Sequence, residues 1–299
     1  MTSPTDFDLW CRTLCKTLED FLQRHLPEAG IVPRHLHEAM RYAVLDGGKR
    51  VRPLLAFAAG ELAEAPPAAV TVVAASIELI HAYSLVHDDL PTMDNDTLRR
   101  GKPTCHVRFG EALALLAGDT LQSLAFQWLS EFPLHPDPRR QLQMIHQLAV
   151  ASGSRGMGGG QAIDLQSTDS TLSLPELEAM HLKKTGALIR AAVLMGAWCG
   201  RELTPTEQQH LAQYANTLGL AFQVVDDVLD AEMDTATLGK TAGKDAAANK
   251  PTYVSIMGLS QARDFSRELL RTAHESLVPF GHHRRRLEEL AHFIVNRRS

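Results

Sequence analysis

Hydrophobic positions recur with helical spacing through nearly the whole chain. Between residues 6 and 26, the apolar side chains fall on one side of a helix: Phe7, Trp10, Leu14, Leu18, Phe21 and Leu22. Alternating strand-like runs joined by hairpin turns do not occur, and neither do repeated βαβ patterns. The pattern therefore predicts an all-α protein.

Prolines and glycines divide this pattern into segments, because both residues interrupt helices. The predicted helices cover residues 6–26, 33–45, a segment after Pro53, 69–88, 111–130, a segment from Arg139 toward the glycines at 153–160, 175–200, 205–231, 251–276 and 283–297. Residues 91–104 and about 232–250 are predicted loops. We find no internal repeat and no linker, so we expect one domain over residues 1–299.

Four aspartates follow the most apolar predicted helix within nine positions: Asp88, Asp89, Asp94 and Asp96. Carboxylates this close repel one another unless a cation neutralises them. The first two also fall at the carboxyl end of the helix, where the helix dipole already disfavours negative charge. Oxygen ligands alone favour a hard ion such as Mg²⁺ or Ca²⁺.

A second acidic cluster lies in the helical run GLAFQVVDDVLD. Asp226 and Asp230 are four residues apart and share a helix face, which Gln223 extends. One such cluster is as often a solvated helix face as a binding site. Two clusters, each embedded in an apolar helix and over a hundred residues apart, predict a site for two or three metal ions between facing helices.

Basic residues accompany both clusters. They are Lys49, Arg50 and Arg52 after a glycine pair, Arg99 and Arg100 after the first cluster, Lys183 and Lys184 at the start of an apolar helix, and Lys240, Lys244 and Lys250 after the second cluster. Each alone is typical of a solvated surface. Beside metal-binding carboxylates they predict a pocket for an anion that also chelates Mg²⁺, such as a diphosphate. The apolar helices around it favour an isoprenoid diphosphate.

Composition excludes several other classes. The chain has 299 residues, 44% hydrophobic content and a net charge of −5, which gives no case for nucleic-acid binding. The four cysteines form no CxxC pair, as is typical of a reducing compartment. The first residues lack the pattern of a signal peptide, and no apolar run has a clean transmembrane length. We expect a cytoplasmic protein with no stable membrane insertion.

Five motifs resemble those of a known family. GGKRVRP, HAYSLVHDDLPTMDNDTLRRGKPTCH, GMGGGQAIDL, KKTGALIRAAV and AFQVVDDVLD stand in the order and spacing found in the short-chain trans-prenyltransferases, and most closely resemble bacterial farnesyl diphosphate synthases. The resemblance covers nearly the whole chain. It implies the isoprenoid synthase fold, a bundle of about ten or more helices around a deep central cavity, with both aspartate clusters at its mouth.

The resemblance also implies roles for individual residues. The diphosphate of isopentenyl diphosphate would contact Lys49, Arg52, His81 and Arg100. The allylic diphosphate would contact Arg99, Lys184, Thr185, Gln223 and Lys240, with Lys250 as a further contact. The magnesium ligands would be Asp88, Asp94, Asp226 and Asp230, holding three ions with substrate bound, while Asp89 and Asp227 stand behind them.

The chemistry implied is ionisation, condensation and elimination. Mg²⁺ and cationic side chains stabilise the departing diphosphate, so that the allylic C–O bond breaks. The double bond of isopentenyl diphosphate attacks the carbocation, and the released diphosphate takes the proton. The residues implied in catalysis are Asp88, Asp94, Asp226, Lys184, Thr185 and Gln223. Thr185, Gln223 and carbonyls at a helix break near Lys184 would shield the cation from water.

Product length is expected to depend on Tyr83 and its neighbour Ser84. Tyr83 precedes Asp88 by five residues, about 7.5 Å along a helix at 1.5 Å per residue. Its ring would form the floor of the cavity, and together with the insertion Pro91-Thr92 this suggests a farnesyl product. The alternative is a tyrosine that only packs in the core.

Three further expectations concern the remaining motifs. The glycines at 156–160 would allow two helices to approach closely or kink, with Gln161 and Asp164 facing the site. His87 would pack or support the site and not bind metal. The basic tail that includes Arg297 is either solvated charge or a segment that folds over the diphosphates.

Four alternative functions share some of these sequence features. A geranylgeranyl diphosphate synthase would differ only in product length. A terpene cyclase would not need the second diphosphate pocket formed by Lys49, Arg52 and Arg100. A non-catalytic subunit of a heteromeric prenyltransferase would be expected to lose the aspartates or the basic set. A Ca²⁺-binding module is disfavoured because no EF-hand loop is present. The resemblance also implies a homodimer, with residues 111–129 as a possible interface.

Overall fold

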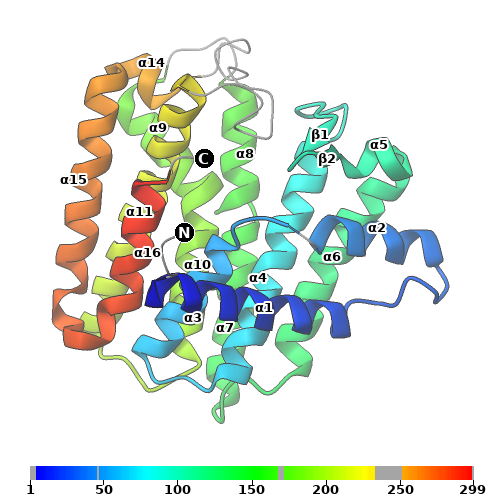
Figure 1. Ribbon diagram of the computed structural model, residues 1–299, viewed down its shortest axis with the longest axis horizontal. Helices are drawn as coiled ribbons and strands as arrows, with labels where there is room; N and C mark the ends of the chain where they lie inside the picture. The colour runs from blue at the N-terminus through cyan, green and yellow to red at the C-terminus, as the bar shows by residue number, and fades with distance from the viewer. Residues whose placement is uncertain (1–4, 46, 168–171, 233–250, 298–299) are drawn as a thin grey trace.

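The computed structural model of the protein describes residues 5–45, 47–167, 172–232 and 251–297. Helices account for most of them, which confirms the all-α prediction (Figure 1). The helices are α1 (Asp6–His25), α2 (Arg34–Val44), α3 (Val51–Leu62), α4 (Pro67–Asp88), α5 (Cys105–Phe109), α6 (Glu111–Glu131), α7 (Pro138–Ser152), α8 (Met157–Gln166), α9 (Leu174–His181), α10 (Ala187–Trp198), α11 (Pro205–Glu232), α14 (Tyr253–Met257), α15 (Leu259–Leu277) and α16 (Arg285–Val295).

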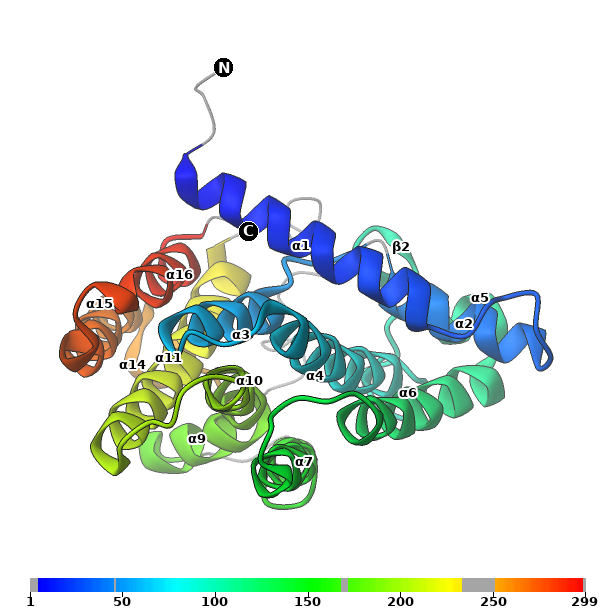
Figure 2. The same ribbon diagram turned by 90° about the horizontal axis from the view of Figure 1, so that it is seen from below.

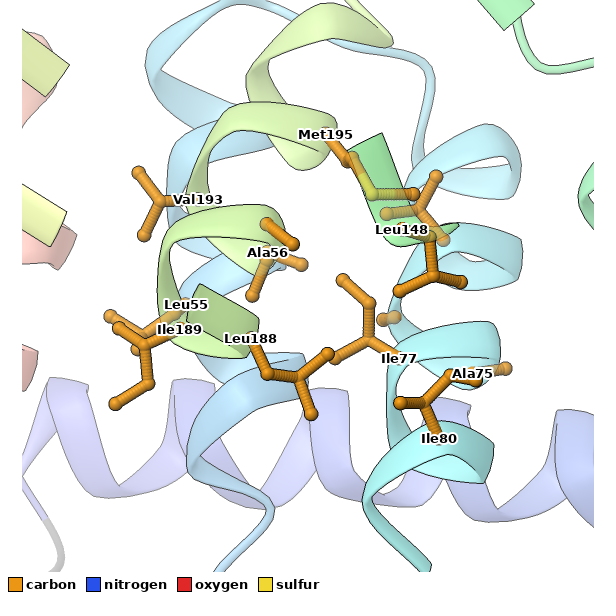
Figure 3. Packing of buried hydrophobic residues seen from close by; sticks show 14 of the residues in the cluster. Leu55, Ala56, Ala75, Ile77, Ile80, Leu148, Leu188, Ile189, Val193 and Met195 are labelled. Carbon is orange, nitrogen blue, oxygen red and sulfur yellow. The ribbon is translucent and has the colours of Figure 1, made fainter. Parts of the chain in front are cut away.

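The core of the bundle is built around α4. This helix packs against α3, α6 and α10, and α1 crosses the outside of α3 and α4 (Figure 2). Apolar side chains from four helices meet there (Figure 3): Ala75, Ile77 and Ile80 of α4, Leu55 and Ala56 of α3, Leu148 of α7, and Leu188, Ile189, Val193 and Met195 of α10. Because α4 is apolar on nearly every side, it can only be stable inside such a layer of helices.

The same apolar composition makes α4 the one helix, among the residues described, with the length and hydropathy of a membrane span. However, 78% of its most apolar stretch is buried inside the fold. Burial of this kind is what a core helix of a helical bundle requires.

Local sequence signals explain several helix boundaries. Thr5 and Asp8 form a capping box that starts α1, and Ser173 and Glu176 form another that starts α9. The expected single helix over 251–276 is wrong in detail. Gly258 adopts a positive φ of 81° and separates α14 from α15, because a residue with positive φ cannot continue a right-handed helix.

The predicted loop at 91–104 contains a small antiparallel hairpin, so the expectation of no strands is also corrected. β1 (Leu98–Arg99) pairs with β2 (Lys102–Pro103), and the turn between them has positive φ at Arg100 and Gly101. This is an unusual geometry for a non-glycine residue. The hairpin lies at the same end of the bundle as the carboxyl end of α4 (Figure 1).

The predicted helix over 175–200 is interrupted by one turn of π-helix, η1 (Leu182–Gly186). A Cβ added to Gly160 of α8 would lie 2.2 Å from the backbone nitrogen of Lys184, and one added to Gly219 of α11 would lie 2.8 Å from the Cα of Gly186. Glycine therefore lets α8 and α11 approach the π-helical turn closely, as was expected for the glycines at 156–160. Such turns are frequent at functional sites.

Candidate active site

The first acidic cluster lies where α4 ends and the chain turns back on itself. Asp88 is the last residue of α4, and its carbonyl accepts a hydrogen bond from the backbone N–H of Asp94 at 2.8 Å. Burial, helped by the carboxylates of Asp94 and Asp89, raises the pKa of the Asp88 carboxyl to about 6, against the opposing pull of Lys184. The cluster thus carries the excess of negative charge that the sequence indicated.

The Asp89 carboxylate forms an ion pair with Arg99 and does not line the Asp88 cavity. Its buried carboxylate accepts from Nε of Arg99 at 2.9 Å and from Nη2 of Arg99 at 2.6 Å. Asp89 therefore supports the cluster from behind, as the sequence predicted. The pair also holds Arg99, which was predicted to contact the allylic diphosphate, with its side chain 28% exposed.

Two cavities adjoin beside this cluster. The first, the cationic cavity, has a volume of about 380 Å³ and is lined by residues that include Lys49, Arg52, His81, Arg99, Arg100, Asp226 and Arg297. The second, the Asp88 cavity, has a volume of about 310 Å³ and is lined by residues that include Tyr83, Ser84, Asp88, Met157, Gln161 and Lys184. Arg52, His81, Leu85 and Thr185 line both. Asp226 of the second cluster and Asp88 of the first therefore border two adjoining cavities.

Positive charge dominates the cationic cavity. His81 is partly buried beside Arg52, with Nε2 3.3 Å from Nη1 of Arg52, and desolvation followed by that guanidinium holds the pKa of His81 well below its usual value. His81 is thus a neutral imidazole at pH 7. Burial also lowers the pKa of Lys49, with a further contribution from Arg297. A cluster of cations that depress one another's pKa values in this way is favourable for an anion.

The second acidic cluster meets the carboxyl-terminal segment. Nη2 of Arg297 lies 2.7 Å from Oδ1 of Asp226 and donates to the carbonyl of Phe222 at 3.1 Å. The guanidinium also stacks over the Phe222 ring at 4.0 Å from its centroid, and only 5% of the side chain is exposed. The interpretation of the tail as solvated charge is therefore wrong for Arg297.

Behind Asp226, the next aspartate, Asp227, links α11 to α14. The Asp227 carboxylate accepts from the side-chain amide of Gln223 at 2.9 Å and from the backbone N–H of Tyr253 at 2.8 Å. Oε1 of Gln223 in turn accepts from the hydroxyl of Thr185 at 3.2 Å. The predicted neighbours Thr185 and Gln223 are thus brought together, with Asp227 behind them.

Lys184 reaches the Asp88 cavity from the π-helical turn. Its Nζ donates to Oδ2 of Asp164 at 2.6 Å, and Gln161 lines the same cavity one turn away on α8. Gln161 therefore lines the site, as predicted, whereas Asp164 is buried behind it and reaches it only through Lys184. Lys184 and Thr185 of the π-helical turn both line the Asp88 cavity.

Arg50 borders the pocket with the other basic residues, but its guanidinium is already paired with carboxylates. It is 6% exposed, adopts a positive φ of 50°, and donates to Glu78 at 2.5 Å, to Glu19 at 3.0 Å and to the carbonyl of Val44 at 2.7 Å. Arg50 therefore lines the cationic cavity together with Lys49 and Arg52, but these contacts commit its guanidinium to anchoring the turn. No local pattern indicated that Glu19 and Glu78 would meet there.

The residues expected to set product length lie on the wall of the Asp88 cavity. Tyr83 is half-buried, and its ring packs edge-on against His87 at a centroid distance of 5.7 Å. Nε2 of His87 lies 3.0 Å from the carbonyl oxygen of Leu115 on α6. His87 therefore packs between α4 and α6, in agreement with its expected role.

The oxygen ligands present suit Mg²⁺ better than a softer ion. Within the described ranges, no group of three or more His, Cys, Asp or Glu side chains is close enough to hold an ion by itself. Mg²⁺ is usually held by one or two carboxylates together with water and substrate phosphates. The residues that would hold it are Asp88 and Asp94 on one side and Asp226 and Asp230 on the other. Lys240, Lys244 and Lys250 lie outside the described residues.

Comparison with known proteins agrees with this geometry. The chain is 47% identical over 286 residues to a probable farnesyl diphosphate synthase of Bradyrhizobium diazoefficiens, which covers 95% of this chain and 86% of the relative. It is 45% identical over 271 residues to geranylgeranyl pyrophosphate synthase 7 of Arabidopsis thaliana, which covers 89% of this chain and 78% of the relative.

Solved structures show the same fold. An apo FPP/GFPP synthase from Zymomonas mobilis superposes with a TM-score of 0.88 at 40% identity, covering 97% of this chain and 99% of the other. A geranyltransferase from Helicobacter pylori, complexed with magnesium and isoprenyl diphosphate, superposes with a TM-score of 0.85 at 31% identity, covering 99% and 98%. The polyprenyl synthetase family model matches residues 33–278. With its two aspartate clusters beside adjoining cavities and this match over most of its length, the chain belongs to the polyprenyl synthetase family.

Proposed function

We propose that the protein condenses isopentenyl diphosphate with dimethylallyl and geranyl diphosphate to form farnesyl diphosphate. One observation carries the proposal: the two acidic clusters border adjoining cavities that share Arg52, His81, Leu85 and Thr185. The cationic cavity is lined by several basic side chains, whereas the Asp88 cavity is lined by Asp88 and by apolar side chains. Two diphosphate substrates can therefore bind with their reacting ends at the shared wall.

The chemistry divides between these two cavities. Lys49, Arg52 and Arg100 hold the diphosphate of isopentenyl diphosphate, and the neutral imidazole of His81 adds a hydrogen bond. Lys184 and the aspartates of both clusters hold the allylic diphosphate, where bound Mg²⁺ would neutralise the charge on the leaving group. Magnesium is supported by the Helicobacter pylori complex, and the four aspartates suggest three ions.

Ionisation of the allylic ester leaves a carbocation at the wall that the two cavities share. Thr185 presents oxygen there, and the double bond of isopentenyl diphosphate attacks from the cationic cavity. Loss of a proton to the departing diphosphate completes the reaction, so no side-chain base is needed. Apolar walls from α4 and α8 exclude the water that would otherwise quench the cation.

A farnesyl product is favoured by Tyr83, which narrows the Asp88 cavity beside Ser84. A geranylgeranyl product is the second candidate, because relatives named for both products match the chain at similar identity. Product length separates the two.

We further propose a single catalytic domain over residues 1–299 that acts as a cytoplasmic homodimer. The exposed faces of α6 support the dimer, since Leu115 and Leu116 are 46% and 50% exposed on this helix. The four free cysteines support a reducing compartment. Sedimentation of the purified protein and fractionation of cells test these two points.

The assay that tests the main proposal uses purified protein, Mg²⁺, labelled isopentenyl diphosphate and each allylic starter, with the products separated by chain length. We expect a fifteen-carbon product from both starters. A twenty-carbon product would favour the second candidate, and no elongation with either starter would contradict the proposal.

A further inference from the structure

Three hydrogen bonds run in series from α14 to the wall between the two cavities. The backbone N–H of Tyr253 donates to Oδ2 of Asp227 at 2.8 Å, and Oδ1 of Asp227 accepts from Nε2 of Gln223 at 2.9 Å. Oε1 of Gln223 then accepts from the hydroxyl of Thr185 at 3.2 Å. Tyr253, Asp227 and Thr185 are all buried, with exposed fractions below a tenth.

The chemistry of the groups fixes the direction of this series. An ionised carboxylate can only accept, and a backbone N–H can only donate. Gln223 must therefore turn its NH₂ group toward Asp227 and its carbonyl oxygen toward Thr185. That carbonyl oxygen accepts the hydrogen bond that the Thr185 hydroxyl donates. The Thr185 hydroxyl can therefore offer only its oxygen lone pairs to any other group.

Thr185 lines both cavities, so the orientation of its hydroxyl affects the electrostatic environment where they meet. A lone pair directed there stabilises a positive charge, whereas an O–H proton directed there opposes it. Oriented dipoles at the point where charge develops are among the largest contributions to catalysis, because they are fixed before the reaction starts.

We propose that Asp227 is a positioning residue that sets the direction of this hydrogen-bond series, and so makes Thr185 present an acceptor oxygen to the junction of the two cavities. The inference rests on the proposed function, because it assigns a polarity to the same site. It also gives Asp227 a role distinct from that of Asp226, whose carboxylate faces the cationic cavity.

The replacement Asp227→Asn provides a demanding test, because it reverses the series and leaves its shape unchanged. The N–H of Tyr253 still requires an acceptor, so the new amide must turn its oxygen toward Tyr253 and its NH₂ toward Gln223. Gln223 must then flip, presenting its carbonyl to that NH₂ and its own NH₂ to Thr185. The Thr185 hydroxyl becomes an acceptor on that side, which frees its proton to point into the junction.

A second variant acts further along the series and keeps the contact between Asp227 and Tyr253. Gln223→Met is close in shape but removes the amide, so nothing holds the Thr185 proton away from the junction. If Asp227 acts only through Gln223, then adding Asp227→Asn to Gln223→Met produces no further change. A role of Asp227 in holding α14 would persist in the double variant.

The experiment measures binding and not turnover. The probes are an allylic ammonium analogue, with a charged nitrogen at the position of the cationic carbon, and a neutral analogue of the same shape, each with inorganic diphosphate and Mg²⁺ in a calorimeter. We expect each single variant to weaken binding of the ammonium probe at least about tenfold, as for loss of one oriented group in an active site, and to change binding of the neutral probe less than about twofold.

The proposal is overturned if the single variants weaken both probes equally, or if Asp227→Asn weakens the ammonium probe further in the Gln223→Met background. A failure of the proposed function looks different: the wild-type protein itself would neither prefer the ammonium probe nor elongate an allylic diphosphate, and that result would remove this inference too. Thermal unfolding of each variant separates a local change of polarity from a loss of fold, and Gln223→Met decides the matter if Asp227→Asn does not fold.

Discussion

Arg297 and Asp226 form an ion pair at the centre of the active site, with 2.7 Å between Nη2 and Oδ1. Asp226 is a predicted metal ligand, so the guanidinium occupies one of the positions from which a metal ion would be held. Arg297 also borders the cationic cavity beside Lys49 and Arg52. Metal binding at Asp226 therefore competes with this pair, and separation of the pair would leave the guanidinium free to contact a diphosphate.

Replacing Arg297 tests this competition directly. We expect Arg297→Gln to tighten binding of Mn²⁺ to the substrate-free protein by about fivefold, because a partly buried pair contributes about 1 kcal/mol. Electron paramagnetic resonance of the free Mn²⁺ measures the affinity. The matched control, Arg271→Gln, removes an arginine that is 67% exposed on α15 and should leave the affinity unchanged. Weaker binding in Arg297→Gln would show that Arg297 does not compete with the metal.

The raised pKa of Asp88 makes a second prediction, about stability. The carboxyl titrates at about 6 in the folded protein and near 3.8 when unfolded, so the folded state binds more protons between these values. The ionised carboxylate therefore destabilises the metal-free protein above pH 6, by about 2–3 kcal/mol, and this penalty declines as the pH falls toward 4.

We expect Asp88→Asn to raise the free energy of unfolding of the metal-free protein at pH 7.5, and to raise it less at pH 5. Urea denaturation at the two pH values measures the effect. Asp264→Asn, on the exposed side of α15, is the control. Equal effects of Asp88→Asn at both pH values would contradict the assigned pKa.

The third prediction concerns the effect of the Tyr83 ring on product length. Removing its ring deepens the Asp88 cavity next to Ser84, so Tyr83→Ala should shift the main product from fifteen to twenty or more carbons. Chromatography of the dephosphorylated products measures the distribution. Tyr42→Ala, which removes a ring that packs on Phe109 away from this cavity, should keep the wild-type product. An unchanged distribution in Tyr83→Ala would leave the ring as a packing residue only.

The buried pair of Arg50 and Glu78 makes the fourth prediction. Glu78→Gln leaves the Arg50 guanidinium in the core with only part of its countercharge, which should cost about 3 kcal/mol of unfolding free energy. The KM for isopentenyl diphosphate should also rise more than the KM for the allylic substrate, because Arg50 anchors the turn that presents Lys49 and Arg52. Glu19→Gln should cost less, since Glu19 is 24% exposed. Equal effects of the two variants on stability and on both KM values would contradict this role.

The sequence predicted the helices and the acidic clusters because both are local. Apolar periodicity and proline or glycine boundaries located α1, α2, α4, α6 and α11 to within a few residues. Spacing alone placed Asp226 and Asp230 on one face, and the motif order placed Lys184 and Thr185 beside the site. These signals depend only on neighbours along the chain.

The features that sequence reasoning missed depend on contacts between distant segments. Arg297 meets Asp226 over a separation of 71 residues, and no local pattern distinguishes it from the solvated arginines nearby. Arg50 has the same residue type as Arg52, and only the positions of Glu19 and Glu78 make it an internal anchor. The π-helical turn at η1 likewise depends on the close approach of Gly160 and Gly219 from other helices.

The central claim is that the aspartates of α4 and α11 hold divalent ions between them, beside the two adjoining cavities, and so release diphosphate from an allylic ester. The most direct measurement is anomalous scattering from crystals soaked with Mn²⁺ and a geranyl thiodiphosphate that resists ionisation. The account predicts Mn²⁺ peaks at Asp88 and Asp94 and at Asp226 and Asp230, all in contact with one diphosphate. Peaks at only one cluster, or a diphosphate that touches neither, would contradict it.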